Sequence, residues 1–384
     1  MKEKMFCYQC EQRKKGKACT TLGECGKTPD IAALQDLIIY QLKGIGTYAN
    51  EVFRKGGEVD EYVIREVEEA LFMTMTEKKL NIEKYVHKLK KLQEVKELIK
   101  KESGKSTKEE CLYKLSETKD EMINDGKEAC ILCDNEKNED IRSLKETVKY
   151  GLKGISWYGN KARQLGKKDN EVDRFYTEAL DYISDRNISY GELLELFFKV
   201  GEMGIRVMEL FAEKNKETFL DEVRKKERIE EERDETWQII KRLVQEINEE
   251  KKYLIILCGN EKGLKRYLKT VNEVPTNCII LTSTSIETEL KSLNLDRNLE
   301  ILNLGEWDRT YLIIQIMKKL KEEVKGNNIF SSIVFSWHDE KDIMELLALL
   351  YSGMKNIKLG PSLPSFFSKN VLNNLWSNYG LEEI

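Results

Sequence analysis

Four cysteines lie within the first 25 residues, and their types and spacing indicate a chemistry more directly than any other part of the chain. Cys7, Cys10, Cys19 and Cys25 follow the pattern C-x2-C-x8-C-x5-C on a short segment that precedes the first predicted helix. Four thiolates converging from one loop are the ligand set of an iron–sulfur cluster. The loop also carries four basic residues, Arg13, Lys14, Lys15 and Lys17. Their charge would offset that of a thiolate-ligated cluster, so the sequence predicts a [4Fe–4S] cluster here.

Three other interpretations of these cysteines stay open. A disulfide framework requires an oxidising compartment, and residues 1–4 begin no recognisable secretory signal. A structural zinc site usually has two short C-x2–4-C pairs, which the longer gaps fit poorly. Unrelated free thiols would not cluster in this way, because the remaining cysteines are scattered between Cys111 and Cys278. The iron–sulfur interpretation is therefore the one we expect.

The charge balance limits the classes of partner. The 384 residues include 64 Lys and Arg against 68 Asp and Glu, a net charge of −4. That balance leaves no surplus of basic residues for a nucleic-acid backbone, so nucleic acid is not an expected partner. No apolar run reaches the length of a membrane span, and we expect a cytoplasmic protein with no membrane partner. An exposed cluster further indicates an anaerobic environment, because its sulfides and thiolates oxidise readily.

An internal repeat organises the first part of the chain. Residues 31–50 (IAALQDLIIYQLKGIGTYAN) and residues 141–160 (IRSLKETVKYGLKGISWYGN) align at an offset of 110. Identical pairs in register include Ile31/Ile141, Leu34/Leu144, Tyr40/Tyr150, Leu42/Leu152, Gly44/Gly154, Tyr48/Tyr158 and Asn50/Asn160. Apolar residues recur at helical spacing in the first copy. Two copies with so long a period predict duplicated helical bundles rather than a solenoid.

The pattern changes after about residue 250. Short apolar runs at 253–258, 278–282, 300–304, 330–336 and 356–359 alternate with helix-length amphipathic stretches. This alternation predicts a Rossmann-like parallel sheet covered on both faces, with any ligand at the carboxyl ends of the strands.

The expected fold is therefore an α and α/β multidomain protein. We expect an iron–sulfur cluster loop at 1–30, helical bundles at 31–125 and 126–236, and a Rossmann-like α/β domain at 250–384.

The motifs around the cysteines resemble a known family. Residues 5–12 (MFCYQCEQ), together with Cys19 and residues 25–28 (CGKT), closely resemble the hybrid cluster (prismane) proteins. These are also called hydroxylamine reductases and are related to nickel–iron carbon monoxide dehydrogenases. The resemblance covers residues 5–236 and 330–384. It implies a pair of helical bundles followed by α/β structure, and a cubane cluster held by the four N-terminal cysteines.

The departures from this family concern its second metal centre, an oxygen-bridged hybrid cluster held by one His, two Glu and four Cys. The positions that correspond to these ligands carry Asn260 for the His, Thr284 or Ser285 (alternatively Glu287) for one Glu, Trp307 for a Cys and Asp339 for the other Glu. The segments carrying the other cysteines are missing. An amide is a poor substitute for imidazole at iron, and an indole cannot be a ligand. The hybrid cluster is therefore predicted to be absent.

Other residues suggest a remodelled second site. Cys130 and Cys133 form another C-x2-C, and Cys258 ends the first predicted strand, beside the lost His position. With His338 or Asp339 they would make a second metal site between domains. The alternatives are a redox dithiol at Cys130 and Cys133, or free thiols there with Cys258 and Cys278 as small buried side chains in strands.

Three functions follow from this sequence. The first is electron transfer through one [4Fe–4S] cluster to a protein partner. The second is a shortened reductase of hydroxylamine or another small molecule that uses the remodelled site. The third is a redox sensor whose cluster orders the N-terminal loop. The sequence leaves the oligomeric state open, with a homodimer as one option.

Overall fold

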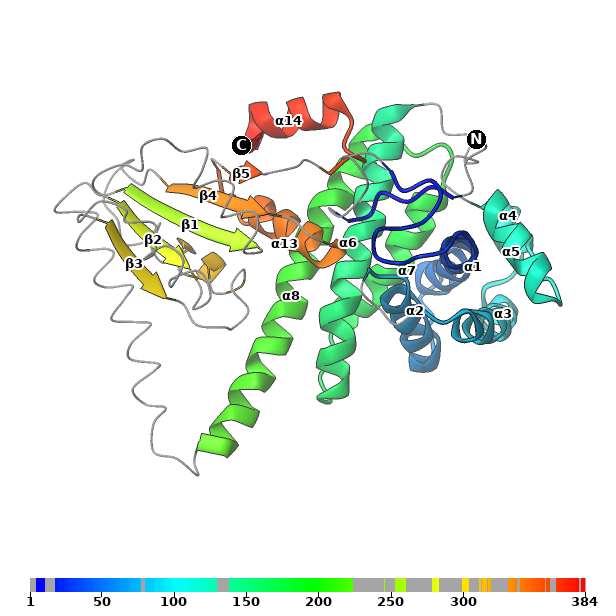
Figure 1. Ribbon diagram of the computed structural model, residues 1–384. Helices are drawn as coiled ribbons and strands as arrows, with labels where there is room; N and C mark the ends of the chain where they lie inside the picture. The colour runs from blue at the N-terminus through cyan, green and yellow to red at the C-terminus, as the bar shows by residue number, and fades with distance from the viewer. Residues whose placement is uncertain are drawn as a thin grey trace. The chain divides into compact units, whose positions relative to one another are not determined.

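The chain is described by a computed structural model, shown in Figure 1, and its described part is predominantly helical. The described residues are 5–10, 18–76, 80–129, 138–223, 253–259, 278–282, 299–303, 331–336, 339–355, 357–359, 364–379 and 381–383, with the single positions and short stretches 245, 311, 313–315 and 317–318. The chain divides into two compact units. The first comprises Met1–Val207, Asp339–Ala348 and Pro364–Val371, and the second comprises Met208–His338, Leu349–Leu363 and Leu372–Ile384.

The first unit is built mainly from helices that carry their own start signals. They are α1 (Pro29–Arg54), α2 (Glu61–Met73), α3 (Ile82–Ser103), α4 (Glu109–Leu112), α5 (Lys119–Glu128), α6 (Glu139–Gln164), α7 (Asn170–Ser184) and the first part of α8 (Tyr190–Val223). Thr28 caps α1 through a hydrogen bond from the Ile31 amide, and Pro29 follows at the first helical position. Asn138 caps α6 in the same way, accepting from the amides of the first turn.

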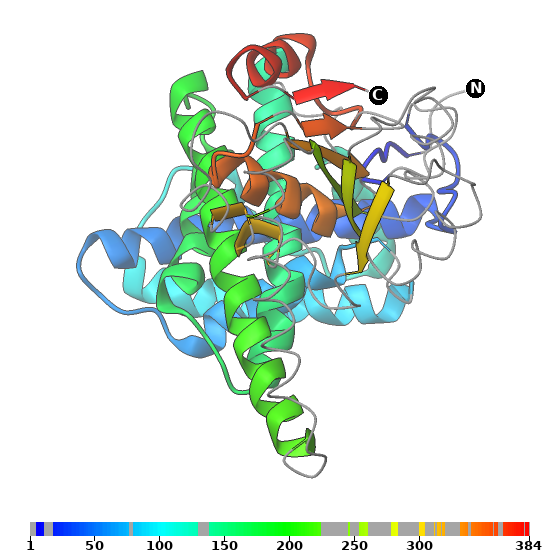
Figure 2. The same ribbon diagram turned by 90° about the vertical axis from the view of Figure 1, so that its left-hand side faces the viewer.

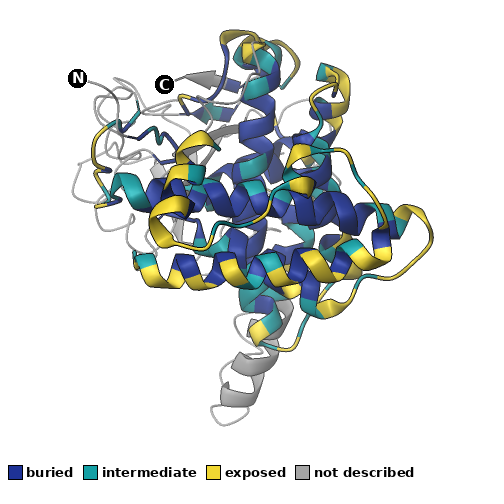
Figure 3. Ribbon diagram, turned by 90° about the vertical axis from the view of Figure 1, so that its right-hand side faces the viewer, coloured by how far each residue is buried: buried dark blue, intermediate teal, exposed yellow. Residues whose placement is uncertain are grey.

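The two copies of the sequence repeat are both helical, as predicted, and bury equivalent residues. The buried pairs on α1 and α6 are Ile31/Ile141, Leu34/Leu144, Ile38/Val148, Leu42/Leu152, Ile45/Ile155 and Tyr48/Tyr158. Figure 3 shows the resulting buried stripes on the helices of this unit, with exposed residues along the outer edges. A stripe of this spacing is the face that an amphipathic helix packs into a core.

Two glycines of the repeat allow close backbone approach. A Cβ at Gly44 would lie 2.4 Å from the Glu110 carbonyl oxygen, and a Cβ at Gly154 would lie 2.7 Å from the Glu340 carbonyl oxygen. Both distances are too short for any side chain. Each copy therefore has glycine at the point where another segment packs directly against its long helix.

The helices of the two repeat copies share one core. Helix α1 packs against α3, α4 and α5 of its own copy and also against α7 of the second copy. Helix α2 of the first copy also packs against α6 of the second. Two helices of the first copy therefore contact helices of the second.

Two segments from the C-terminal part of the sequence complete the first unit. One is the start of α13 (Glu340–Tyr351), whose Met344 fills the space left by Gly154 and Gly204. In the other, the Ser368 amide donates to Ser143 Oγ at 2.9 Å and the Ser368 hydroxyl donates to Asp140 Oδ1 at 2.6 Å. The sequence analysis placed residues 250–384 in one domain and did not anticipate these contacts.

The second unit contains a six-stranded parallel sheet, whose strands are drawn as arrows in Figure 2. Its strands are β1 (Tyr253–Gly259), β2 (Cys278–Thr282), β3 (Leu299–Asn303), β4 (Ser331–Ser336), β5 (Ile357–Leu359) and β6 (Leu381–Glu383). The order across the sheet is β3-β2-β1-β4-β5-β6. The unit also includes α14 (Lys369–Tyr379) from Leu372 onward. The chain segments between β1 and β2 and between β2 and β3, on which a covering of both faces depends, lie outside the described residues.

None of the helices in the described ranges combines the length and the apolar composition needed to cross a membrane.

Candidate metal centre

The four N-terminal cysteines lie on one loop, here called the cysteine loop (residues 5–10 and 18–28), whose two halves are joined by backbone hydrogen bonds. The Cys7 amide donates to the Cys19 carbonyl at 3.0 Å, and the Cys19 amide donates to the Cys7 carbonyl at 2.8 Å. This antiparallel bridge holds two of the thiols on adjacent strands of backbone. Cys10 and Cys19 are buried, whereas Cys7 and Cys25 are half-buried.

A tight turn positions the last of these cysteines. The Gly23 amide donates to the Lys27 carbonyl at 2.8 Å, closing a loop around Cys25. A Cβ at position 23 would lie 3.3 Å from Cys25 Sγ and 3.0 Å from Lys27 Cβ. Glycine therefore leaves free the space beside the Cys25 sulfur that a side chain would fill.

A buried lysine faces the thiols. Lys27 is only 2% exposed, and its Nζ donates to Cys7 Sγ at 3.6 Å. Burial disfavours the charged form of Lys27, but its pKa is nevertheless raised by four neighbouring acidic groups, Cys7, Glu340, Cys25 and Asp36. Lys27 thus places a positive charge against a sulfur of the cysteine loop.

A second buried lysine comes from α6. Lys153 Nζ donates to Gln9 Oε1 at 3.1 Å and to the Thr74 carbonyl at 3.3 Å. The Gln9 amide in turn donates to Thr76 Oγ1 at 3.4 Å, which ties the cysteine loop to the end of α2. Burial lowers the pKa of Lys153 to about 8, against the opposing charge of Glu340.

Glu340, the first residue of α13, supplies the opposite charge. Its side chain is fully buried, and both carboxylate oxygens accept from the Thr76 amide at 3.2 Å. Burial raises its pKa, and the nearby Lys153 opposes that rise. The position at the start of a helix favours a negative charge.

Aromatic rings fix the cysteine loop on α6. Tyr8 stacks on Phe366 with ring centroids 6.0 Å apart and meets the edge of Tyr150 at 6.3 Å. Tyr150 and Phe366 are in contact at 4.8 Å. Burial, followed by the charge of Glu146, raises the pKa of Tyr8 well above its ordinary value, so its hydroxyl stays protonated.

A small cavity of about 30 Å³ lies between this loop and the helices, large enough for one water molecule. Its lining includes Cys7, Lys27, Asp36, Lys149 and Lys153. We use the name cysteine pocket for the group formed by Lys27, Asp36, Lys153 and Glu340 around the inner side of the cysteine loop.

The donor set of the loop fits an iron–sulfur cluster. Within the described ranges no three His, Cys, Asp or Glu side chains converge as ligands of a single metal ion do. In a four-iron cluster each thiolate binds a different iron at its own corner, so the sulfurs lie farther apart than around one ion. Soft thiolates, the space beside Cys25 and the Lys27 ammonium at Cys7 all suit such a cofactor.

The residues predicted for a second site are only partly described. Cys130, Cys133 and His338 lie outside the described residues. Cys258 lies in β1, where its backbone pairs with Phe335 of β4. Asp339 directly precedes α13; its Oδ1 accepts from the Lys341 amide at 2.8 Å, and its own amide donates to Asp342 Oδ2 at 3.3 Å. That exchange is typical of a helix cap.

Comparison with known proteins gives the family. The sequence pattern of the "Prismane/CO dehydrogenase family" matches residues 5–240 and 249–384. The chain belongs to this family. The predicted resemblance to the hybrid cluster proteins is thereby confirmed, and it supports a hybrid-cluster-like iron–sulfur redox protein.

The curated relatives show how the chain differs in length. A hydroxylamine reductase of Thermoanaerobacter pseudethanolicus is 25% identical over 532 residues, covering 98% of this chain and 97% of the relative. One of Syntrophobacter fumaroxidans is 26% identical over 531 residues, covering 99% and 98%. One of Clostridium perfringens is 37% identical over 222 residues, covering 56% and 40%. Alignments of more than 500 residues exceed the 384 residues here, so the relatives contain segments that this chain lacks.

The charged residues of the cysteine pocket were not among the site residues predicted from the sequence. Lys27 stood in a quoted motif, Lys153 in the repeat and Glu340 beside a lost ligand position. The signal available in the sequence was that each of the three lies in one of these motifs, but only the fold brings them together.

Proposed function

We propose that this chain transfers electrons one at a time through a single [4Fe–4S] cluster held by Cys7, Cys10, Cys19 and Cys25. The observation that carries the proposal is the loop itself, where four thiols share one hydrogen-bonded segment and Lys27 donates to Cys7 Sγ at 3.6 Å. When bound, the cluster supplies reversible one-electron chemistry. The chain's own residues hold the thiolates and supply positive charge.

The same proposal includes the loss of the family's hybrid cluster. Its support is the replacement of the expected ligands by Asn260, Trp307 and Asp339, together with the missing segments. Asp339 takes part in capping α13, which is a structural use of the side chain. We also propose that the parallel sheet is the core of one Rossmann-like domain, in place of the two α/β domains of full-length members.

Electron transfer requires a protein partner that can approach the loop. Leu22, between Cys19 and Cys25, is 56% exposed. The sequence of the same loop is basic between residues 13 and 17. An exposed apolar residue, in a segment whose sequence is also rich in basic residues, suits brief docking of an acidic redox protein.

The test is an anaerobic preparation analysed for iron, acid-labile sulfide and electron spin resonance. We expect about four irons and about four sulfides per chain, with the resonance of a reduced cubane. A clearly larger iron content would indicate a second cluster and contradict the proposal. Oxidation of the reduced protein by an added redox protein, followed by stopped-flow absorbance, measures the electron transfer itself.

A second candidate is a reductase with a remodelled site. The observation that favours it is the register of the sheet, which puts Cys258 opposite Phe335 at the carboxyl ends of adjacent strands. Ligands of α/β sheets bind at such ends. This candidate predicts turnover of hydroxylamine with a reduced dye, lost in Cys258→Ser. Absence of turnover in the iron-loaded wild-type protein would exclude it for that substrate.

A further inference from the structure

We propose that Lys27 sets the reduction potential of the cluster by donating a hydrogen bond to the Cys7 thiolate, with Glu340 as the buried countercharge that limits its effect. This inference rests on the proposed function, because it concerns the cluster held by the cysteine loop. It assigns a role to two residues that are not themselves ligands.

The contact between Lys27 and Cys7 is direct and shielded from solvent. Nζ lies 3.6 Å from Sγ, and the lysine is only 2% exposed. Hydrogen bonds to cluster sulfurs, net charge and solvent exposure are the means by which a protein tunes such a potential. A buried ammonium acts through two of them, since it donates a hydrogen bond and also brings a positive charge that is poorly screened. Both effects stabilise the reduced, more negative cluster.

The backbone holds Lys27 in place on both sides. Its carbonyl accepts from the Gly23 amide at 2.8 Å, and the next residue, Thr28, is the N-cap of α1. The ammonium is therefore presented from a fixed turn at the start of a long buried helix, and not from a mobile surface side chain.

Glu340 acts in the opposite direction. It is fully buried, faces both Lys27 and Lys153, and is fixed by the Thr76 amide and hydroxyl. Within the described part of the chain no carboxylate lies within 4.0 Å of the Lys27 or Lys153 ammonium, so these charges interact across the pocket without a direct ion pair. Removing the negative charge of Glu340 would leave the positive field at Cys7 less opposed.

The experiment measures the midpoint potential of the full-length, iron-loaded protein by anaerobic spectroelectrochemical titration. Lys27→Met should lower the potential, and Glu340→Gln should raise it while keeping an oxygen to accept from Thr76. Lys27→Arg retains the charge and should restore most of the wild-type potential. Lys101→Met, at an exposed position in the last turn of α3, is the matched control for loss of one lysine and should leave the potential unchanged.

The outcomes separate this inference from the proposed function. Wild-type iron and sulfide in Lys27→Met with an unchanged potential would overturn the role of Lys27 and leave the cluster assignment intact. If Lys27→Met fails to assemble a cluster, Glu340→Gln decides, because an unchanged or lowered potential in that variant also overturns the inference. A wild-type protein without any iron–sulfur cluster would overturn the proposed function and this inference with it.

Discussion

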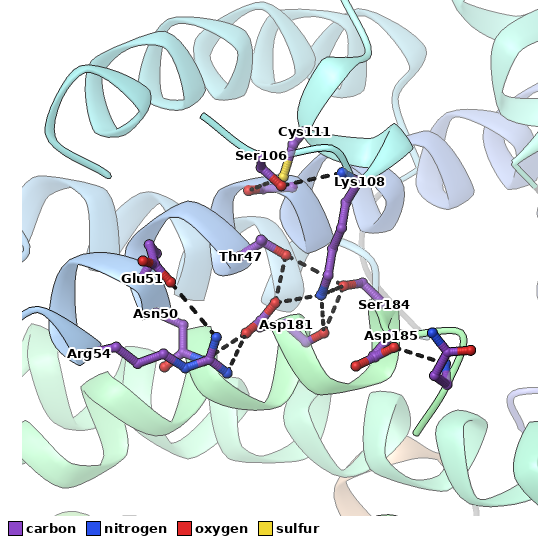
Figure 4. Close-up of polar contacts among 12 residues, drawn as sticks. Thr47, Asn50, Glu51, Arg54, Ser106, Lys108, Cys111, Asp181, Ser184 and Asp185 are labelled. Atoms are coloured by element: carbon purple, nitrogen blue, oxygen red, sulfur yellow. Dashed lines mark hydrogen bonds and ion pairs between the residues drawn. The ribbon is translucent and has the colours of Figure 1, made fainter. Parts of the chain in front are cut away.

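Two of the groups of buried charged side chains in the first unit are constructed differently. The first surrounds Asp181 on α7 (Figure 4). Its Oδ1 accepts from Thr47 Oγ1 at 2.8 Å and lies 2.6 Å from Lys108 Nζ. Its Oδ2 accepts from Asn50 Nδ2 at 2.8 Å and lies 3.1 Å from an Arg54 nitrogen. Each carboxylate oxygen therefore has two donors, and the group joins α1 to α7 and to the segment that precedes α4.

The cysteine pocket has the opposite construction. Lys27 donates to a sulfur, Lys153 donates to an amide and a carbonyl, and Glu340 accepts from Thr76. The two lysines and the carboxylate face one another without direct ion pairs in the described structure, and burial shifts the pKa of Lys153 to about 8.

The difference shows how buried charge can serve either stability or chemistry. A carboxylate saturated by direct donors stabilises the packing of the helices that supply them. Charges that remain separate act through their field on whatever lies nearby, which here is a thiolate ligand. Changes at Asp181 should therefore alter stability and spare the cluster, whereas changes in the pocket should alter the cluster.

The largest expected effect is the loss of the cluster itself. Cys10→Ala removes one of four ligands, and we expect the visible absorption and the iron content to disappear. The matched control is Cys111→Ala, since Cys111 is also buried but its Sγ contacts the Gly44 carbonyl at 3.6 Å. Cys111→Ala should retain full iron. Full colour and iron in Cys10→Ala would contradict the ligand assignment.

The next largest effect tests the Asp181 group. Asp181→Ala leaves the buried Asn50 amide without its acceptor and Thr47 with only the longer contact to Ser184, and we expect a loss of about 2–3 kcal/mol in the free energy of unfolding. The two cations left behind, Lys108 and Arg54, keep access to water. The loss of unfolding free energy should therefore be smaller than when both charges of an ion pair are buried. Urea unfolding followed by fluorescence measures it.

The control for Asp181→Ala is a surface carboxylate in the same region. Glu51→Ala removes ion pairs with Arg54 and Lys55 at an exposed position, and should change the free energy of unfolding by less than about 1 kcal/mol. Both variants should keep the cluster and its potential. A shifted potential in Asp181→Ala would contradict the contrast between the two groups.

The equivalent glycines of the repeat offer a paired test, because Gly44 abuts the segment that carries Lys108 and Gly154 abuts Glu340. An added Cβ forces the backbone apart in either case, while alanine favours the helix, so we expect a net loss of about 1–2 kcal/mol for each variant. Only Gly154→Ala moves Glu340, and so only that variant should shift the reduction potential. Equal potentials in the two variants would show that Glu340 exerts no influence on the cluster.

Local patterns predicted the elements of this chain well. The helices of both repeat copies follow from apolar spacing, since Ile31 and Ile141 begin equivalent buried stripes. The five apolar runs after residue 250 coincide with β1 to β5 to within a residue at either end. The four cysteines proposed as cluster ligands were also recognisable from the sequence, because they fall within one short segment.

The long-range packing of these elements could not be predicted from the sequence in the same way. No local pattern indicates that α1 packs on α7, or that residues 339–348 return to the helical unit. The cysteine pocket combines Lys27, Asp36, Lys153 and Glu340, which come from separate parts of the sequence and are individually ordinary. Their chemistry arises from burial and proximity, and these exist only once the chain has folded.

The smallest expected effect is a pH dependence of stability that originates in the cysteine pocket. Burial raises the pKa of Asp36 to about 6, although Lys149, Lys27 and Lys153 oppose the rise. Between about pH 4 and pH 6 the folded protein therefore holds a proton that the unfolded chain has released, so stability falls as the pH rises through this window. Asp36→Asn cannot titrate and should lose this dependence. Because Asp36 is only half-buried, we expect the wild-type protein to lose only about 1 kcal/mol between about pH 5 and pH 7.5 relative to Asp36→Asn. Urea midpoints of the two proteins at both pH values measure the difference, and parallel curves would show that the pocket does not hold Asp36 in its protonated form.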